Sequence, residues 1–131
     1  MTKRDLQQYR SLCGEINAIK DEIERLQTFV QSPQLAGLHR GGGHPDRVGG
    51  LVVKKVDLEN RLLDKVEQLY MLRQKIESAI ERLGADQRLL LRYRYIEGRP
   101  WESICIKMHY QWAQIHRIHA KAVQALQDDT Q

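Results

Sequence analysis

The sequence predicts an all-α protein, with two long helices followed by a module of three short ones. Only eight of the 131 residues are aromatic and only twelve are Gly or Pro, a composition that disfavours a β-sandwich. Apolar residues recur at spacings of three and four over most of the chain, which is the period of an amphipathic helix. Six glycines and two prolines between residues 32 and 50 interrupt this pattern.

The first long helix is expected over residues 6–31. Its apolar positions alternate at spacings of three and four over three heptads: Tyr9, Leu12, Ile16, Ile19, Ile23, Leu26 and Val30. A stripe this narrow is buried by one partner helix, as in a coiled coil. Gly14 inside it costs ~1 kcal/mol relative to Ala, which the stripe on either side can offset.

Residues 32–50 are expected to form a flexible connection without regular structure. Their glycines do not indicate a phosphate-binding loop, because no Gly-Lys-Ser/Thr sequence follows them.

A second long helix is expected from about residue 52 to residue 83, ended by Gly84. Its predicted stripe comprises Val52, Val53, Val56, Leu62, Val66, Leu69, Ile76, Ile80 and Leu83, widened by Leu63, Tyr70 and Leu72. Two helices of similar length predict an antiparallel helical hairpin, or coiled coil, over residues 1–83. Pairing between two chains would bury the same stripes, so both arrangements stay open.

Residues 84–127 predict three short helices arranged as a helix-turn-helix module. Asp86 can cap the first, over residues 87–96, and Pro100 suits the first position of the second. A break at His109 and Tyr110 precedes the third, over residues 111–126. The inward residues of the last two helices are Trp101, Ile104, Cys105, Met108, Ile115, Ile118, Ala122 and Leu126.

The positive charge of the chain is concentrated in this module. The whole chain has a net charge of +4, and residues 84–127 carry seven basic side chains against three acidic ones. Such a segment attracts polyanions, because binding a phosphate releases condensed counterions. Charge by itself also fits a solvated helix face.

The third short helix is the expected DNA reader, because this helix enters the major groove in helix-turn-helix proteins. Arg117 can donate twice to a guanine, and Gln111 or Gln114 can pair with an adenine. The expected base-reading residues are Gln111, Trp112, Gln114, His116 and Arg117. The expected phosphate contacts are Arg92, Arg94, Arg99, Lys107 and Lys121. Packing of Trp112 over Trp101 or Tyr110 is the open alternative for that residue.

His116 and His119 are expected on the DNA-facing surface, where protonation would strengthen DNA binding at low pH. They do not predict a metal site, because no nearby Cys, Asp or Glu completes a tetrahedron. No cofactor is expected, and no catalytic pattern indicates an enzyme. No membrane span or secretory signal is expected from this sequence, and its two cysteines, Cys13 and Cys105, fit a reducing cytoplasm.

Residues 89–126 resemble the region-four helix-turn-helix of sigma factors. A Leu-rich helix ends in Arg94-Tyr95, a turn contains Gly98, and the next helix carries Ile104. The last helix closes with Ala120-Lys121-Ala122-Val123 and Leu126. With the two long helices and the glycine-rich connection, residues 94–104 also resemble the ArpU-type transcriptional regulators of phages and prophages.

This resemblance implies sequence-specific binding to double-stranded DNA and control of late or lysis-related phage genes in a bacterial cytoplasm. Ala113 stands where sigma factors have a polar residue, so no base contact is expected there. A complete sigma factor is excluded by length. A homodimer through the long helices is expected, and contact with RNA polymerase stays open. The alternatives are a DNA-packaging subunit similar to small terminases, or a polymerase-binding adaptor.

Overall fold

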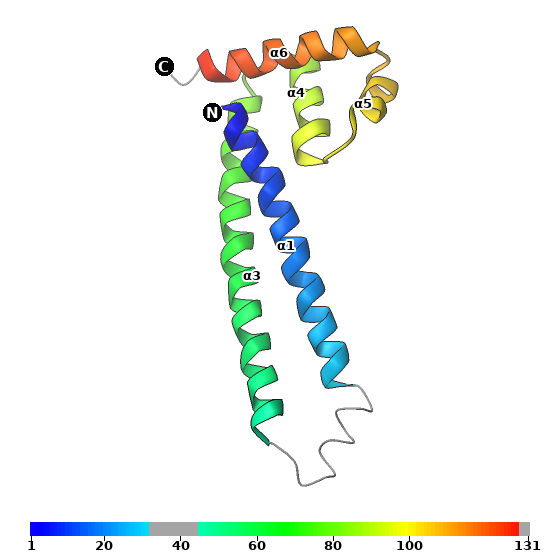
Figure 1. Cartoon of the computed structure of the whole chain (residues 1–131). Helices are drawn as coiled ribbons and strands as arrows, with labels where there is room; N and C mark the ends of the chain where they lie inside the picture. The colour runs from blue at the N-terminus through cyan, green and yellow to red at the C-terminus, as the bar shows by residue number, and fades with distance from the viewer. Residues whose placement is uncertain (32–44, 129–131) are drawn as a thin grey trace. The chain divides into compact units, whose positions relative to one another are not determined.

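The computed structural model describes residues 1–31 and 45–128 of the protein. Every regular element in these ranges is a helix, so the described part of the chain has the predicted all-α class (Figure 1). The elements are α1 (Lys3–Val30), α3 (Pro45–Ile80), α4 (Ala85–Leu91), the π-helix η1 (Arg92–Ile96), α5 (Trp101–Met108) and α6 (Trp112–Asp128).

The chain forms two compact units. The first unit consists of Met1–Cys13 together with Leu69–Gln131, and the second unit consists of Gly14–Gln68. This division differs from the expected one at residues 83 and 84. The difference arises because the first turns of α1 contribute Leu6 and Tyr9 to the same buried cluster as the short helices.

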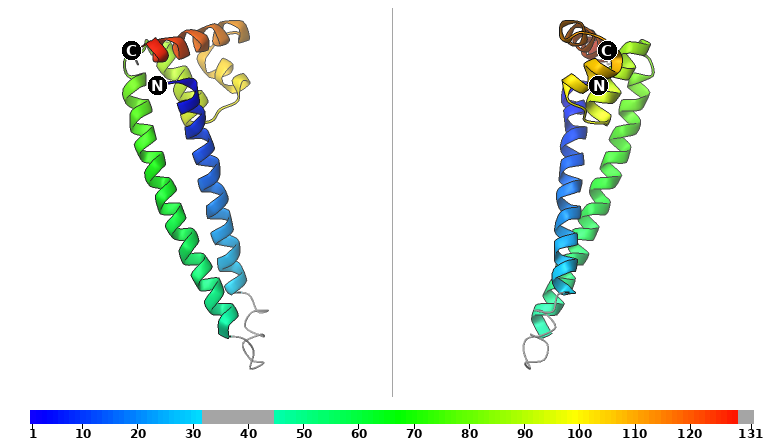
Figure 2. Two further views of the ribbon diagram at one scale, coloured as in Figure 1. Left: turned by 60° about the vertical axis from the view of Figure 1, so that its left-hand side comes forward. Right: turned by 90° about the vertical axis from the view of Figure 1, so that its right-hand side faces the viewer.

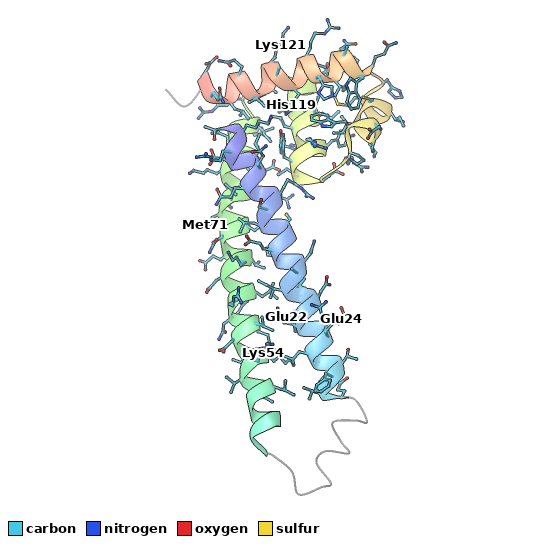
Figure 3. The ribbon with its side chains drawn as sticks, viewed as in Figure 1. Glu22, Glu24, Lys54, Met71, His119 and Lys121 are labelled. Carbon is cyan, nitrogen blue, oxygen red and sulfur yellow. The ribbon has the colours of Figure 1, made fainter. Side chains whose placement is uncertain are left out.

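In the second unit, α1 and α3 run in opposite directions and are joined by two ion pairs. Lys54 Nζ lies 3.9 Å from Glu22 Oε1, and Lys65 Nζ lies 2.9 Å from Glu15 Oε2. Figure 3 shows Glu22 and Lys54 between the two helices. Within the same stretch, three apolar residues are buried: Ile16, Ile19 and Leu58. The predicted stripe of α1 is thus confirmed at Ile16 and Ile19.

The buried face of α3 in the second unit is not the face predicted from spacing. Leu58, which the predicted stripe omitted, is buried, whereas Val52, Val53, Val56 and Val66 are exposed. The helix has apolar residues on two faces, so its period by itself does not determine which face meets α1.

Helix α3 also begins earlier than expected. Residues 45–50 are helical, so the prediction of a connection without regular structure is wrong there. Pro45 occupies the first helical position, where its missing N–H costs nothing. A Cβ at Gly49 or Gly50 would have no neighbouring atom within 4 Å. The rest of the predicted connection, residues 32–44, lies outside the described residues.

The core of the first unit is built by six elements. Leu6 and Tyr9 of α1 and Ile76 and Ile80 of α3 join residues from the helix-turn-helix module. Those residues are Leu90, Leu91, Tyr95, Ile104, Met108, Ile115, Ala122 and Leu126. Helix α6 packs mainly on α4 and also on α5, and both views of Figure 2 show the three helices together.

The turn between α5 and α6 lies where the sequence predicts it. His109 adopts the left-handed conformation with φ 60°, and its N–H bonds the carbonyl of Cys105 at the end of α5. This αL residue ends α5 and redirects the chain into α6.

Three local predictions in this module are corrected. Gly84, not Asp86, is the N-cap of α4, and Asp86 accepts a 2.7 Å hydrogen bond from Tyr110 Oη instead. Pro100 is the N-cap of α5 and not its first residue. The expected helix over residues 87–96 changes at Arg92 into a π-helical turn, in which the N–H of Glu97 bonds the carbonyl of Arg92.

Candidate nucleic-acid interface

The outer face of α6 carries an uninterrupted polar and basic stripe. Gln111 precedes the helix and accepts the N–H of Ile115, which places it at the N-cap position. Gln114, Arg117 and Lys121 follow at spacings of three and four, and all are exposed. No described carboxylate forms an ion pair with Arg117 or Lys121 within the chain. The structure therefore brings together four of the expected DNA-contacting side chains.

The inner face of α6 anchors this stripe. Ile115, Ala122 and Leu126 are buried in the core of the first unit. Because the inner face is fixed by packing, the orientation of the outer face is fixed with it.

Trp112 and His116 form a ring cluster with Trp101 at the start of α6. The ring centroid of His116 lies 4.5 Å from that of Trp112 and 4.6 Å from that of Trp101. His116 is half-buried, and its buried Nε2 atom makes no hydrogen bond in the structure. Trp112 remains half-exposed. Of the expected base-reading residues, His116 thus packs behind the surface that Trp112 presents.

His119 does not lie on the outer face of α6, contrary to the expectation from helical spacing. It points toward the other helices of the first unit, whereas Lys121 points away from them (Figure 3). Its Nε2 atom lies 2.7 Å from Tyr95 Oη, and its ring contacts Trp101. Burial, together with the charges of Lys3, His116 and Arg94, lowers the pKa of His119 to about 4. His119 is therefore neutral at physiological pH and cannot strengthen DNA binding there.

The five expected phosphate contacts have different surroundings. Arg92 is engaged by Glu77 at 2.7 Å and by Glu81 at 3.5 Å, and Arg99 is engaged by Glu97 at 3.0 Å. An arginine that is already paired neutralises less phosphate charge than one that is not.

The other three basic residues form no ion pair with described carboxylates. Lys107 and Lys121 are exposed, and the Lys107 ammonium lies 5.5 Å from the ring centre of Tyr93. Arg94 is half-buried, with its guanidinium 4.4 Å above the ring of Trp101 and a 3.1 Å hydrogen bond to the carbonyl of Arg99. Lys107 and Lys121 are thus the best placed of the five for DNA.

The sequence predictions missed three polar residues of α1 that lie against the module. Lys3, Gln7 and Arg10 line the same hollow as Arg94 and His119. The sequence contained part of the evidence that these turns of α1 pack against another element, because Leu6 and Tyr9 form an apolar face there. A stripe of apolar residues does not say which part of the chain will cover it.

Among the side chains that the structure describes, no three or more His, Cys, Asp or Glu residues are arranged to hold a metal ion. None of the described helices combines the length and the apolar character that crossing a membrane requires. Comparison with protein-family models, with curated proteins and with solved structures found no match.

Proposed function

We propose that this protein is a sequence-specific DNA-binding regulator of transcription, of the kind that phages and prophages carry. The observation that carries the proposal is the outer face of α6, where Gln114, Arg117 and Lys121 are exposed without acidic partners among the described residues. This helix follows the left-handed turn at His109, as the reading helix of a helix-turn-helix does. The expected resemblance to region four of sigma factors supports the same interpretation.

In this proposal the outer face divides into readers and positioning residues. Arg117 donates two hydrogen bonds to a guanine, and Gln111 or Gln114 pairs with an adenine, each discriminating by ~1–3 kcal/mol. Trp112 contributes apolar contact to a thymine methyl or a sugar, supported from behind by His116. Lys107 and Lys121 contact phosphates and set the register without reading sequence.

The test is selection from a randomised DNA pool, followed by binding assays with single variants. We expect Arg117→Ala to relax base choice at one position, and Lys107→Ala to weaken all duplexes alike and reduce the salt slope by about 1. Arg25→Ala is the matched control, because it removes an exposed cation from the second unit. The proposal is wrong if no motif is enriched or if Arg25→Ala weakens binding as much as Arg117→Ala.

The purified protein also allows two alternative functions to be tested. A ring of many subunits that binds DNA without sequence preference would indicate a packaging subunit similar to small terminases. Co-purification with RNA polymerase without DNA affinity would indicate an adaptor. We propose that the protein acts without a cofactor in the cytoplasm of a bacterial host, where the DNA it reads is located.

We further propose that α1 and α3 form an antiparallel coiled-coil scaffold and that two chains pair through α3. Val52, Val56, Leu63 and Val66 are between 42% and 67% exposed and follow one another at heptad positions. The charged residue at the intervening position, Glu59, lies 3.8 Å from Lys55 of its own helix, so its charge is balanced. A dimer would present two copies of α6 to two half-sites.

Sedimentation or light scattering tests the dimer. Leu63→Glu places a charge in the centre of the stripe and is expected to give a monomer with unchanged helicity. Asn60→Glu on the same helix is the control, because Asn60 is exposed and lies outside the stripe. A wild-type monomer at micromolar concentration, or a Leu63→Glu dimer, would contradict pairing through this face.

A further inference from the structure

The first unit contains a basic hollow on the side of α6 opposite its outer face. It has a volume of about 520 Å³, and its charged and polar side chains come from three elements. Helix α1 contributes Lys3, Gln7 and Arg10, η1 contributes Arg94 and Tyr95, and α6 contributes His119. A hollow of this size is within the range of small-molecule sites, ~300–1,000 Å³.

The charges of the hollow have one sign. Its lining includes no Asp or Glu, and Lys3, Arg10 and Arg94 form no ion pair with any described carboxylate. Three permanent cations that share one concave surface repel each other, and they attract a multivalent anion. The effect is visible on His119, whose pKa is lowered first by burial and also by the charges of Lys3 and Arg94.

Two of the cations lie against the segment that joins η1 to α5. The Arg10 guanidinium lies so close to Gly98 that a Cβ there would collide with it, and Gly98 has φ +70°. The Arg94 guanidinium is fixed between the Trp101 ring and the carbonyl of Arg99. Positioned guanidinium groups bind phosphate more specifically than mobile ammonium groups do.

We propose that this hollow binds a small phosphorylated molecule, up to the size of a nucleoside monophosphate. The phosphate group contacts Lys3, Arg10 and Arg94, and Gln7 supplies an additional amide donor. This inference does not depend on DNA binding by α6.

A DNA duplex bound on the outer face of α6 is not expected to supply the phosphate that binds in the hollow. Lys121 and His119 point to opposite sides of α6 (Figure 3), so a duplex lying on the outer face does not reach the hollow that His119 lines. A phosphate in the hollow is therefore expected to belong to a free ligand and to leave the outer face accessible.

The test is a titration of the full chain with inorganic phosphate and with AMP, followed by NMR. We expect saturable shifts of the Gly98 amide and the Trp101 indole N–H in the millimolar range or tighter. Lys3→Ala combined with Arg10→Gln should weaken binding by about tenfold or more, since two charges at contact distance are lost. Arg4→Ala combined with Arg25→Ala is the matched control, because these exposed α1 residues do not line the hollow.

A second measurement places the anion beside His119. Sulfate keeps its double charge over the relevant pH range, and a bound dianion stabilises the protonated imidazole. We therefore expect saturating sulfate to raise the pKa of His119 from its value of about 4.

Three results of these two measurements would overturn the proposal. They are an absence of saturable shifts at Gly98 and Trp101, an equal loss of affinity in the Arg4/Arg25 control, and an unchanged pKa of His119 in sulfate. Displacement of bound phosphate by duplex DNA would also overturn it, because the hollow would then take a backbone phosphate. A chain that binds phosphate normally but selects no DNA motif would refute the proposed function and leave this inference standing.

Discussion

His119 illustrates how strongly a side chain depends on what packs against its helix. Its ring lies among Tyr95, Trp101 and the charged side chains Lys3 and Arg94. These neighbours come from three other elements, so the sequence of α6 by itself cannot predict them. The result is an imidazole that is neutral well below the usual histidine range.

This neutral histidine predicts a pH dependence of stability. The pKa of His119 is about 4 in the folded protein, against an ordinary value of 6.5 for the unfolded chain, so the unfolded chain binds more protons between these values. The contribution of His119 to the free energy of unfolding is therefore fully present above about pH 6.5 and is lost as the pH decreases toward 4. Allowing for the partial solvent exposure of the ring, the loss between about pH 7 and about pH 5 is about 1 kcal/mol.

Urea unfolding of wild type and His119→Gln at both pH values measures this difference. The variant is expected to be less stable at neutral pH, because it loses the ring contacts, but to show a smaller decrease on acidification. Equal pH dependence in the two proteins would show that His119 titrates normally in the folded state.

Arginines of the same segment show a similar dependence on context. Arg92 and Arg94 are two residues apart in η1, yet the first pairs with Glu77 and Glu81 whereas the second stacks on Trp101. The carboxylates come from α3 and the segment that follows it, and the ring comes from α5. Sequence spacing grouped both arginines as phosphate contacts because it could not include these partners.

At the scale of elements, α3 has apolar residues on more than one face. One face buries Leu58 in the second unit, and another leaves Val56 and Leu63 exposed. The connection between η1 and α5 depends instead on a single backbone conformation, that of Gly98 at φ +70°. A glycine in such a connection and a glycine inside a long helix therefore respond in opposite ways to the same substitution.

Gly98→Ala is expected to destabilise the protein by about 1–2 kcal/mol, because a Cβ is unfavourable at positive φ. The Arg10 side chain must also move away from the new methyl group. Gly14→Ala is the matched substitution in α1, where a Cβ meets nothing within 4 Å, and is expected to stabilise by ~0.5–1 kcal/mol. Thermal unfolding of both variants checks the signs; a neutral or stabilising Gly98→Ala would contradict the left-handed geometry.

At the scale of the whole chain, the two ends of the sequence share one core. Leu6 has no exposed surface, and it belongs to the same buried cluster as Ile104 and Ile115 of the helix-turn-helix. A module of about 44 residues buries little surface by itself, so added apolar contacts contribute a large fraction of its stability.

Leu6→Ala is therefore expected to destabilise the helix-turn-helix, although Leu6 lies about 80 residues earlier in the chain. The cost of emptying a fully buried leucine site is ~2–5 kcal/mol. Ile106→Ala is the control in the same unit, because Ile106 is 74% exposed and should change stability by less than about 0.5 kcal/mol. Amide exchange in α6 is the measurement. Unchanged protection there in Leu6→Ala would show that the α1 contact is dispensable.

The sequence by itself determined the helical class, the turn at His109 and Tyr110, and the inward residues Ile115, Ala122 and Leu126 of α6. These features depend on local periodicity and on chain-reversal chemistry, which neighbouring residues specify. It also selected Gln114, Arg117 and Lys121 as DNA contacts, and all three side chains are exposed on α6.

Only the tertiary structure decided what covers each face. It placed Leu6 and Tyr9 in the core of the helix-turn-helix, selected Leu58 over Val56 for burial on α3, and turned His119 inward. It also gathered Lys3, Arg10 and Arg94 around one hollow. These outcomes depend on contacts between residues far apart in the chain, and helical periodicity carries no information about such partners.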